Sequence, residues 1–293
     1  MGNETNKKLK AIIERRNATL ILGAFNAITA MQIEDAGFEA VYLTGAGITN
    51  AQLGLPDLGF ITLDNLVDTV NSVREVCTLP VIVDVDTGFG NEVNVYRTIR
   101  CLERAEANGV QIEDQEFPKK CGHFEKKRVV PVNEAVNKIK AAADSRNDEN
   151  FCIIARTDSR AIHGFNSAID RAGAFVEAGA DIIFIESPLT KEEISNIPKL
   201  ICAPNMINIV YGGKTPELEK KELEECGYSI VLYANALLQA SILSSFETLN
   251  YIKKFGCLKG YEDRLINFDQ RQKILNKNFF DDLEEKYSSK SEK

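Results

Sequence analysis

Short apolar runs rich in β-branched residues alternate eight times along this chain with segments of helical periodicity. The helical spacing is clear where Val95, Ile99 and Leu102 recur at intervals of four and three residues. A glycine such as Gly109 or Gly179, which can end a helix in a left-handed conformation, stands shortly before the next run. The eight expected strands are Thr19–Leu22, Ala40–Leu43, Pro80–Asp84, Val110–Glu113, Phe151–Arg156, Asp181–Glu186, Met206–Ile209 and Ile230–Tyr233. Eight alternating units predict a parallel (β/α)8 TIM barrel more readily than an open doubly wound sheet.

Helical segments flank the expected barrel at both ends. The first 18 or so residues predict an extra helix, and residues from about 235 to 293 predict a helical C-terminal extension. In that extension Leu237, Leu238, Ile242 and Leu243 fall on one stripe. Because no linker or low-complexity segment interrupts the chain, we expect residues 1–293 to form a single barrel domain with this extension.

Charge and cysteine content exclude several classes of protein. Asp and Glu number 43 against 35 Lys and Arg, and the net charge of −8 argues against nucleic acid or an anionic membrane as partner. No run of 18 apolar residues predicts a membrane span, and the charged N-terminus lacks the apolar core of a signal peptide. The seven cysteines form no CxxC pair, which favours a reducing cytoplasm over a disulfide framework.

Polar residues stand where the expected strands end. They are Thr44, Asp84, Asp86, Glu113, Arg156, Glu186 and Asn208. Any one of them taken alone is compatible with a helix cap or a loop residue. Together they predict an active site at the carboxyl ends of the strands, where TIM-barrel enzymes place their chemistry.

The strongest cluster is the run VIVDVDTGFG. Side chains alternate along a strand, so Asp84 and Asp86 are expected on one face, and two neighbouring carboxylates repel unless a cation lies between them. Glu113 and Asp57 are available to complete the group. Oxygen ligands without histidine suit a hard ion such as Mg2+. The alternative is a buried ion pair with Arg156 or a lysine.

A basic, glycine-containing segment follows Glu113 and carries one cysteine. Cys121 lies between Lys119, Lys120 and His123, where positive charge would lower its thiol pKa toward the range that an acid/base residue needs. A small buried hydrophobe is the alternative for Cys121, and a solvated loop is the alternative for the basic run. We expect a mobile loop that closes over a dianionic substrate.

These motifs, in this order, resemble the isocitrate lyase / phosphoenolpyruvate mutase superfamily. The resemblance covers about residues 8–255 and rests on LTGAG, LGLPDLG (53–59), DVDTGFG (84–90), IEDQ (112–115), KKCGH (119–123) and ARTD (155–158). KKCGH indicates the short lyase branch. The resemblance implies a TIM barrel that swaps its eighth helix between subunits, a homotetramer built as a dimer of swapped dimers, and a gating loop at about Glu116–Pro131.

The resemblance also implies a role for each matching residue. It places Mg2+, with Mn2+ as a possible substitute, directly on Asp84, and the waters of the ion on Asp86, Glu113 and Asp57. It implies that one substrate carboxylate is held by Thr44, Gly45, Ala46 and Arg156. The second carboxylate would be held by Asn208, Gly122, His123 and Glu186, with Leu232 and Ala234 in the pocket wall. Cys121 would be the general acid and Tyr42 would steer the hydroxyl proton, with Arg156, His123 and Lys119 also catalytic.

The implied reaction is the metal-dependent retro-Claisen cleavage of a small 2-hydroxy dicarboxylate. The overall similarity is greatest to enzymes that cleave 2,3-dimethylmalate to propanoate and pyruvate, and that is the substrate we expect. Alanine at 234 departs from the proline and serine that we expect there for cleavage of 2-methylisocitrate and for hydrolysis of oxaloacetate. Those two reactions, oxaloacetate decarboxylation and phosphonopyruvate chemistry remain alternatives, as do a Schiff-base aldolase using Lys119 or Lys120 and a non-catalytic binding protein.

Overall fold

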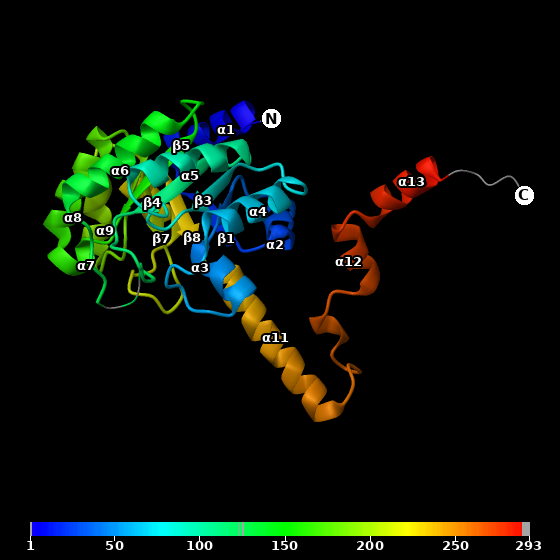
Figure 1. The fold of residues 1–293 in the computed structure, drawn as a ribbon. Helices are drawn as coiled ribbons and strands as arrows, with labels where there is room; N and C mark the ends of the chain where they lie inside the picture. Colours follow the sequence, from blue (N-terminus) through cyan, green and yellow to red (C-terminus); the bar gives the residue numbers. More distant parts are fainter. Residues whose placement is uncertain (1, 123, 125, 289–293) are drawn as a thin grey trace, which may run out of the picture. The chain divides into compact units, whose positions relative to one another are not determined.

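The computed structural model describes residues 2–122, 124 and 126–288, and its eight strands close into one parallel barrel (Figure 1). Each strand pairs with the next, and the last pairs with the first. The strands are β1 (Thr19–Ala24), β2 (Val41–Leu43), β3 (Val81–Asp84), β4 (Gly109–Glu113), β5 (Cys152–Thr157), β6 (Ile182–Ile185), β7 (Asn205–Asn208) and β8 (Ile230–Tyr233). The predicted TIM barrel and all eight predicted strands are confirmed, with strand ends that shift by at most two residues.

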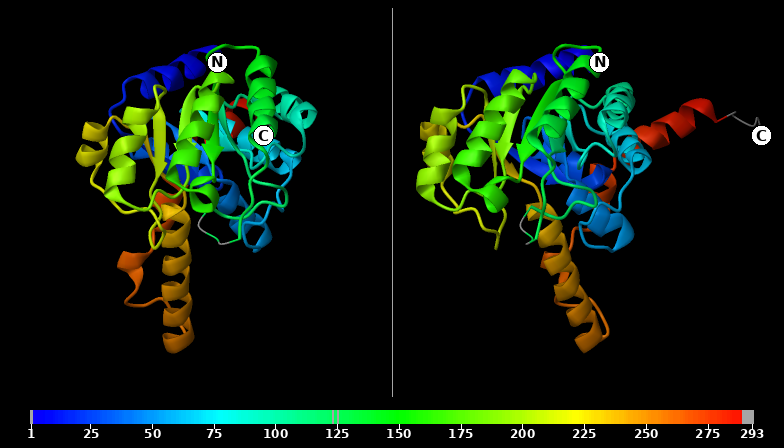
Figure 2. Two further views of the ribbon diagram at one scale, coloured as in Figure 1. Left: turned by 90° about the vertical axis from the view of Figure 1, so that its left-hand side faces the viewer. Right: turned by 60° about the vertical axis from the view of Figure 1, so that its left-hand side comes forward.

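Helices connect the strands and surround the barrel (Figures 1 and 2). Within the first 239 residues they are α1 (Gly2–Glu14), α2 (Ala27–Asp35), α3 (Gly45–Ile48), the π-helical η1 (Thr49–Leu53), α4 (Leu63–Arg74), α5 (Glu92–Arg104), α6 (Val132–Ser145), α7 (Arg160–His163), α8 (Phe165–Glu177), α9 (Lys191–Leu200) and α10 (Lys220–Cys226). The helical periodicity predicted for α5 is confirmed, because Val95, Ile99 and Leu102 are all buried. The side chain of Asn91 caps its first turn.

The barrel interior is apolar at its N-terminal end. The extra helix α1, predicted from the sequence, contributes Leu9, Ile12 and Ile13 to the same buried cluster as Ile21 and Ile82 from the strands. The side chains from α1 cover this end of the barrel, and the cluster holds no charged group. The polar groups inside the barrel therefore collect at the carboxyl ends of the strands.

The segment after β3 differs from the expectation in one respect. β3 ends at Asp84 as predicted, but the alternation expected to place Asp86 on the same face does not reach it, because Asp86 has a left-handed backbone with φ of 50°. The two carboxylates nevertheless lie together, since a Cβ atom on Gly45 would be 3.2 Å from Asp84 Oδ2 and 3.3 Å from Asp86 Oδ1. Their proximity comes from a turn and not from strand alternation.

The chain divides into two compact units, residues 1–239 and 240–293. Helix α11 (Ala236–Phe255) begins in the first unit and continues into the second, which also holds η2 (Glu262–Arg264), α12 (Phe268–Ile274) and α13 (Lys277–Tyr287). The expected stripe on α11 is split, because Leu238 is buried whereas Ile242 and Leu243 are exposed. In the part of the chain that the structure describes, no helix combines the length and the apolar character needed to cross a membrane.

Candidate active site

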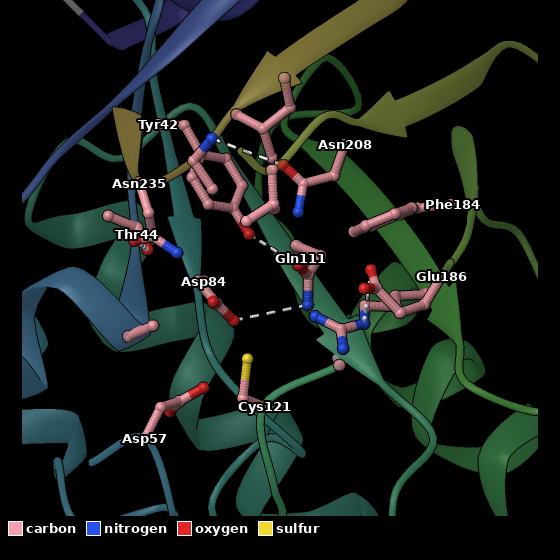
Figure 3. Close-up of a pocket in the computed structure, with 16 residues that line it drawn as sticks. Tyr42, Thr44, Asp57, Asp84, Gln111, Cys121, Phe184, Glu186, Asn208 and Asn235 are labelled. Carbon is pink, nitrogen blue, oxygen red and sulfur yellow. Dashed lines mark hydrogen bonds and ion pairs between the residues drawn. The ribbon is translucent and has the colours of Figure 1, made fainter. Parts of the chain in front are cut away.

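A small pocket opens at the carboxyl ends of the strands, beneath the loop that follows β4 (Figure 3). Its lining combines buried acids, one arginine, a cysteine and an apolar wall. The lining residues are Tyr42, Thr44, Ala46, Asp57, Asp84, Gln111, Cys121, Gly122, Arg156, Phe184, Glu186, Asn208, Val210, Leu232, Ala234 and Asn235. The space open to the centres of water molecules is only about 40 Å³, which suits a small acid.

Four carboxylates from three segments of the chain converge on one side of this pocket. Asp84 ends β3, Glu113 ends β4, Asp86 follows in the turn, and Asp57 comes from the loop after η1. All four are buried, and Glu113 Oε1 accepts no hydrogen bond from the described residues. Burial raises the pKa values of Asp84 and Glu113, and it raises that of Asp86 to about 7 despite the nearby ammonium of Lys119. This cluster is therefore a strong attractor for positive charge.

Lys119 supplies part of that charge from the loop. Its Nζ lies 2.5 Å from Asp57 Oδ1 and 2.7 Å from Asp86 Oδ1, and its side chain is almost fully buried. Burial lowers the pKa of Lys119, but the surrounding carboxylates outweigh that effect and hold its pKa well above the usual range. A permanently protonated amine is not a nucleophile, so the geometry argues against Lys119 as a Schiff-base lysine.

The charges around the pocket leave room for a further cation. Among the described residues near the site, six buried carboxylates face three buried cations; the carboxylates are Asp57, Asp84, Asp86, Glu113, Asp158 and Glu186, and the cations are Lys119, Lys127 and Arg156. No three His, Cys, Asp or Glu side chains in the described ranges meet as a ready-made set of direct ligands. The donors therefore fit an ion such as Mg2+, which binds through one or two carboxylates and keeps several waters.

Arg156, near the end of β5, lines the pocket and is held there by carboxylates. It donates two hydrogen bonds to Asp158, at 3.0 and 3.1 Å, and its Nη1 lies 3.2 Å from Glu113 Oε2. Its guanidinium also lies over the ring of Phe184. Although burial opposes the charge, these carboxylates hold the pKa of Arg156 well above its usual range, so it remains a positive group aimed at the pocket.

The loop 116–131 is bound to the barrel by two buried lysines. Lys119 pairs with Asp57 and Asp86 as described, and Lys127 Nζ lies 2.5 Å from Asp158 Oδ1 and also donates to the carbonyl of Gly122. Both lysines thus neutralise buried carboxylates instead of facing a substrate, which refines the expectation of a basic loop closing over a dianion. Their attachment brings Cys121 and Gly122 into the pocket lining.

Gly122 packs directly against two side chains of the pocket. A Cβ atom at this position would lie 2.4 Å from Arg156 Nη2 and 2.4 Å from Glu186 Oε1, inside the contact limit. A side chain at this position would have to displace Arg156 and Glu186 or move the loop itself. The neighbouring Cys121 donates its backbone N–H to the Asp57 carbonyl, at 3.2 Å, and its thiol points toward the space between Asp57 and Asp84 (Figure 3).

The far wall of the pocket is mainly apolar. Phe184, Val210, Leu232 and Ala234 line it, and Asn208 is its one amide. The Oδ1 atom of Asn208 accepts the Ala234 N–H at 3.4 Å, which leaves the amide nitrogen facing the pocket as a donor (Figure 3).

Most of the residues expected at the site line this pocket. Tyr42, Thr44, Ala46, Asp57, Asp84, Cys121, Gly122, Arg156, Glu186, Asn208, Leu232 and Ala234 do so. Asp86, Glu113, Lys119 and Gly45 lie in contact with the lining residues without forming part of the lining. His123 lies outside the described residues, so its expected roles stay predictions.

Four lining residues were not predicted from the sequence: Gln111, Phe184, Val210 and Asn235. Period-two alternation back from Glu113 puts Gln111 on the same face of β4, and the same rule from Glu186 points to Phe184. Asn235 lies two residues beyond the end of the last strand, close to where other polar site residues stand. Val210 carries no chemical signal in the sequence.

Comparison with known proteins gives consistent results. The family model of phosphoenolpyruvate phosphomutase matches residues 9–252. The chain is 39% identical over 285 residues to the 2,3-dimethylmalate lyase of Eubacterium barkeri, covering 97% of this chain and 99% of that one. It is 40% identical over 284 residues to the 2-methylisocitrate lyase of Aeropyrum pernix, covering 97% and 91% of the two chains.

Solved structures show the same relationship. A crystal structure of 2,3-dimethylmalate lyase superposes with a TM-score of 0.90 at 27% identity and covers 98% of this chain and 96% of that one. The complex of phosphonopyruvate hydrolase with oxalate and Mg2+ superposes with a TM-score of 0.87 at 26% identity, over 97% and 99% of the two chains.

Proposed function

The chain belongs to the phosphoenolpyruvate phosphomutase family and is a carbon–carbon lyase of the isocitrate lyase superfamily, and from that premise we propose that it uses Mg2+ to cleave a small 2-hydroxy dicarboxylate. The substrate proposed is 2,3-dimethylmalate, with propanoate and pyruvate as products. The observation that carries this proposal is the pocket itself, which brings a cysteine, one arginine and an acidic cluster around a space for a small acid.

The acidic cluster supports the choice of a divalent ion. Asp84 would hold the ion directly, and Asp57, Asp86 and Glu113 would hold its waters. A further cation fits here because the buried carboxylates near the site outnumber the buried cations. When bound, the ion would polarise the substrate hydroxyl and its neighbouring carboxylate and so favour loss of the hydroxyl proton. Mn2+ accepts the same oxygen ligands and is expected to substitute for Mg2+.

The residues of the chain then divide the remaining work. Arg156 pairs with the carboxylate next to the hydroxyl-bearing carbon, and Tyr42 accepts the hydroxyl proton in a hydrogen bond. The bond between C2 and C3 breaks, C2 becomes the carbonyl carbon of pyruvate, and the electron pair of the bond passes to C3 of the other half. Cys121 gives its thiol proton to C3, which completes propanoate, and the proton released from the hydroxyl restores the thiol. The reaction consumes no water, and the loop over the pocket keeps water away from the carbanion.

The pocket supports a dicarboxylate more than a tricarboxylate. Arg156 is the one cation among the described lining residues, because Lys119 and Lys127 are engaged with Asp57, Asp86 and Asp158. A third carboxylate, as in 2-methylisocitrate, would enter without a cation of its own, and burying an unpaired charge is costly. The apolar wall suits methyl groups, which 2,3-dimethylmalate carries on both reacting carbons.

The direct test is a panel of substrates with and without EDTA. Purified protein with Mg2+ is mixed with 2,3-dimethylmalate, 2-methylisocitrate, oxaloacetate or phosphonopyruvate, and pyruvate is followed by coupled oxidation of NADH, with acetate assayed for oxaloacetate hydrolysis. We expect EDTA-sensitive pyruvate from 2,3-dimethylmalate at the highest kcat/KM. Faster turnover of 2-methylisocitrate, as in the Aeropyrum pernix relative, would keep the reaction class and overturn the substrate. Absence of turnover across the panel would contradict the proposed function.

We also propose that the chain assembles as a homotetramer in which α11 is exchanged between subunits. The support is a set of large apolar side chains exposed on this helix: Ile242, Leu243, Phe246, Leu249, Ile252 and Phe255. Light scattering after size exclusion should give about 130 kDa for four chains of 32.5 kDa each. A monomer that turns over substrate at the full rate would contradict the proposal.

A further inference from the structure

Gln111 forms the floor of the pocket and joins two of its functional groups. The residue lies on β4, its side chain is fully buried, and below it the barrel interior is apolar. Its Oε1 accepts a hydrogen bond from the Tyr42 hydroxyl at 2.6 Å, and its Nε2 faces Asp84 Oδ1 at 3.4 Å (Figure 3). One amide thus connects the expected proton-steering tyrosine to the expected metal ligand.

The two neighbours fix which way the amide points. Asp84 Oδ1 is a carboxylate oxygen that already accepts the backbone N–H of Asp86 at 3.2 Å. Because a carboxylate oxygen accepts hydrogen bonds, it attracts the NH2 end of the Gln111 amide. The carbonyl end must then face Tyr42, and a carbonyl can only accept. The Tyr42 hydroxyl is therefore forced to donate its proton to Gln111.

This arrangement decides what Tyr42 can offer to a ligand. A phenol hydroxyl that donates its proton to one partner can interact with other partners only as a hydrogen-bond acceptor. Burial and the nearby carboxylates raise the pKa of Tyr42 well above its usual range, so the hydroxyl keeps that proton. The lone pairs that remain lie at the pocket, where they fit the hydroxyl group of a substrate.

From this geometry we infer that Gln111 is a positioning residue, which turns Tyr42 into an obligate acceptor for the substrate hydroxyl. The inference rests on the proposed function, because it assumes that a 2-hydroxy acid binds above Tyr42. It predicts that replacing Gln111 weakens the binding of ligands with a hydroxyl group and leaves the binding of matched ligands without one unchanged. A merely structural role would affect both kinds of ligand alike.

The test compares Gln111→Met, Tyr42→Phe and the double variant with the unchanged protein. Calorimetry measures binding of malate and of succinate, which lacks the hydroxyl group, each with Mg2+. We expect the unchanged protein to prefer malate and Gln111→Met to lose that preference by roughly threefold to tenfold, the range of one neutral hydrogen bond. The double variant should lose no more than the worse single variant, because both changes remove the same interaction.

Kinetics with the cleaved substrate gives the second measurement. We expect Gln111→Met to lower kcat by about tenfold or more and to raise KM by no more than the threefold to tenfold lost in malate binding, since proton removal is affected as well as binding. Asn205→Leu is the matched control: Asn205 is a buried amide on β7 that does not line the pocket, and this variant should keep the malate preference. Thermal unfolding checks each fold, and Gln111→Leu replaces the methionine variant if that one does not fold.

Three results would overturn the inference, and they separate its failure from the failure of the proposed function. If the unchanged protein prefers malate and the folded apolar Gln111 variant keeps that preference, Gln111 does not position Tyr42 although the proposed function stands. The same conclusion follows if the losses in Gln111→Met and Tyr42→Phe simply add. If the unchanged protein binds neither dicarboxylate with Mg2+, the proposed function itself fails, and the inference fails with it.

Discussion

Adding a single methyl group at Gly122 should open the site without disturbing the barrel. The Cβ atom of Gly122→Ala would lie 2.4 Å from both Arg156 Nη2 and Glu186 Oε1. Arg156 cannot give way easily, because two hydrogen bonds to Asp158 and an ion pair with Glu113 hold it. The loop must therefore withdraw and take Cys121 with it.

The size of the effect follows from the distance. Ordinary contacts begin at about 3.4 Å, so the loop has to move by about 1 Å, a displacement that can cost about a hundredfold in rate when it misplaces a reacting group. We expect kcat/KM to fall by about that factor, equivalent to about 2.7 kcal/mol. The assay is the coupled measurement of pyruvate with the substrate identified by the panel.

A second measurement reports on the loop without any turnover. Alkylation of Cys121 by iodoacetamide, followed by peptide mass spectrometry, should be faster in Gly122→Ala than in the unchanged protein. Cys202, which is exposed, and Cys77, whose pKa burial raises to about 11, serve as fast-reacting and slow-reacting reference thiols.

Gly173→Ala is the matched control for the added methyl group. Gly173 lies in α8, and a Cβ atom there would meet nothing within 4 Å, so activity and alkylation should stay unchanged. If Gly122→Ala keeps more than a third of kcat/KM and its Cys121 is alkylated at the normal rate, the claim that this glycine sets the approach of the loop is wrong.

Four further results are expected. Cys121→Ser should sharply reduce kcat with an unchanged thermal unfolding curve, because a hydroxyl is a far weaker acid than a thiol; near-normal turnover would remove the thiol from the mechanism. Lys119→Met should cost about 3–5 kcal/mol in urea unfolding without added metal, since it leaves Asp57 and Asp86 unpaired, and an unchanged midpoint would refute that role. Removal of metal with EDTA should abolish turnover and Mg2+ or Mn2+ should restore it, whereas borohydride added with substrate should leave the protein mass unchanged; a trapped adduct would point to a Schiff base. Gly23→Ala should destabilise the fold by roughly 4 kcal/mol or more, because its Cβ would lie 1.8 Å from the Ala234 carbonyl oxygen, and a normal melting temperature would contradict the close packing of β1 on the end of β8.

The fold was accessible from the sequence because its signal is local and repeated. About a dozen residues are enough to predict each strand, each helix and each glycine between them. Eight such repeats are compatible with few architectures. The position of the site followed from the same pattern, since a barrel brings the carboxyl ends of all its strands together. Asp84, Glu113 and Arg156 could therefore be assigned to one site before any contact was known.

The partners of those residues were decided by the tertiary structure alone. The sequence left open whether a lysine would neutralise the acidic cluster, and the fold places Lys119 on Asp57 and Asp86. It gave Gln111 no role, and closure of the barrel brings that amide between Tyr42 and Asp84. Such contacts join residues 27 to 69 positions apart, and they depend on the stagger of the strands and the path of a loop, which no local pattern encodes.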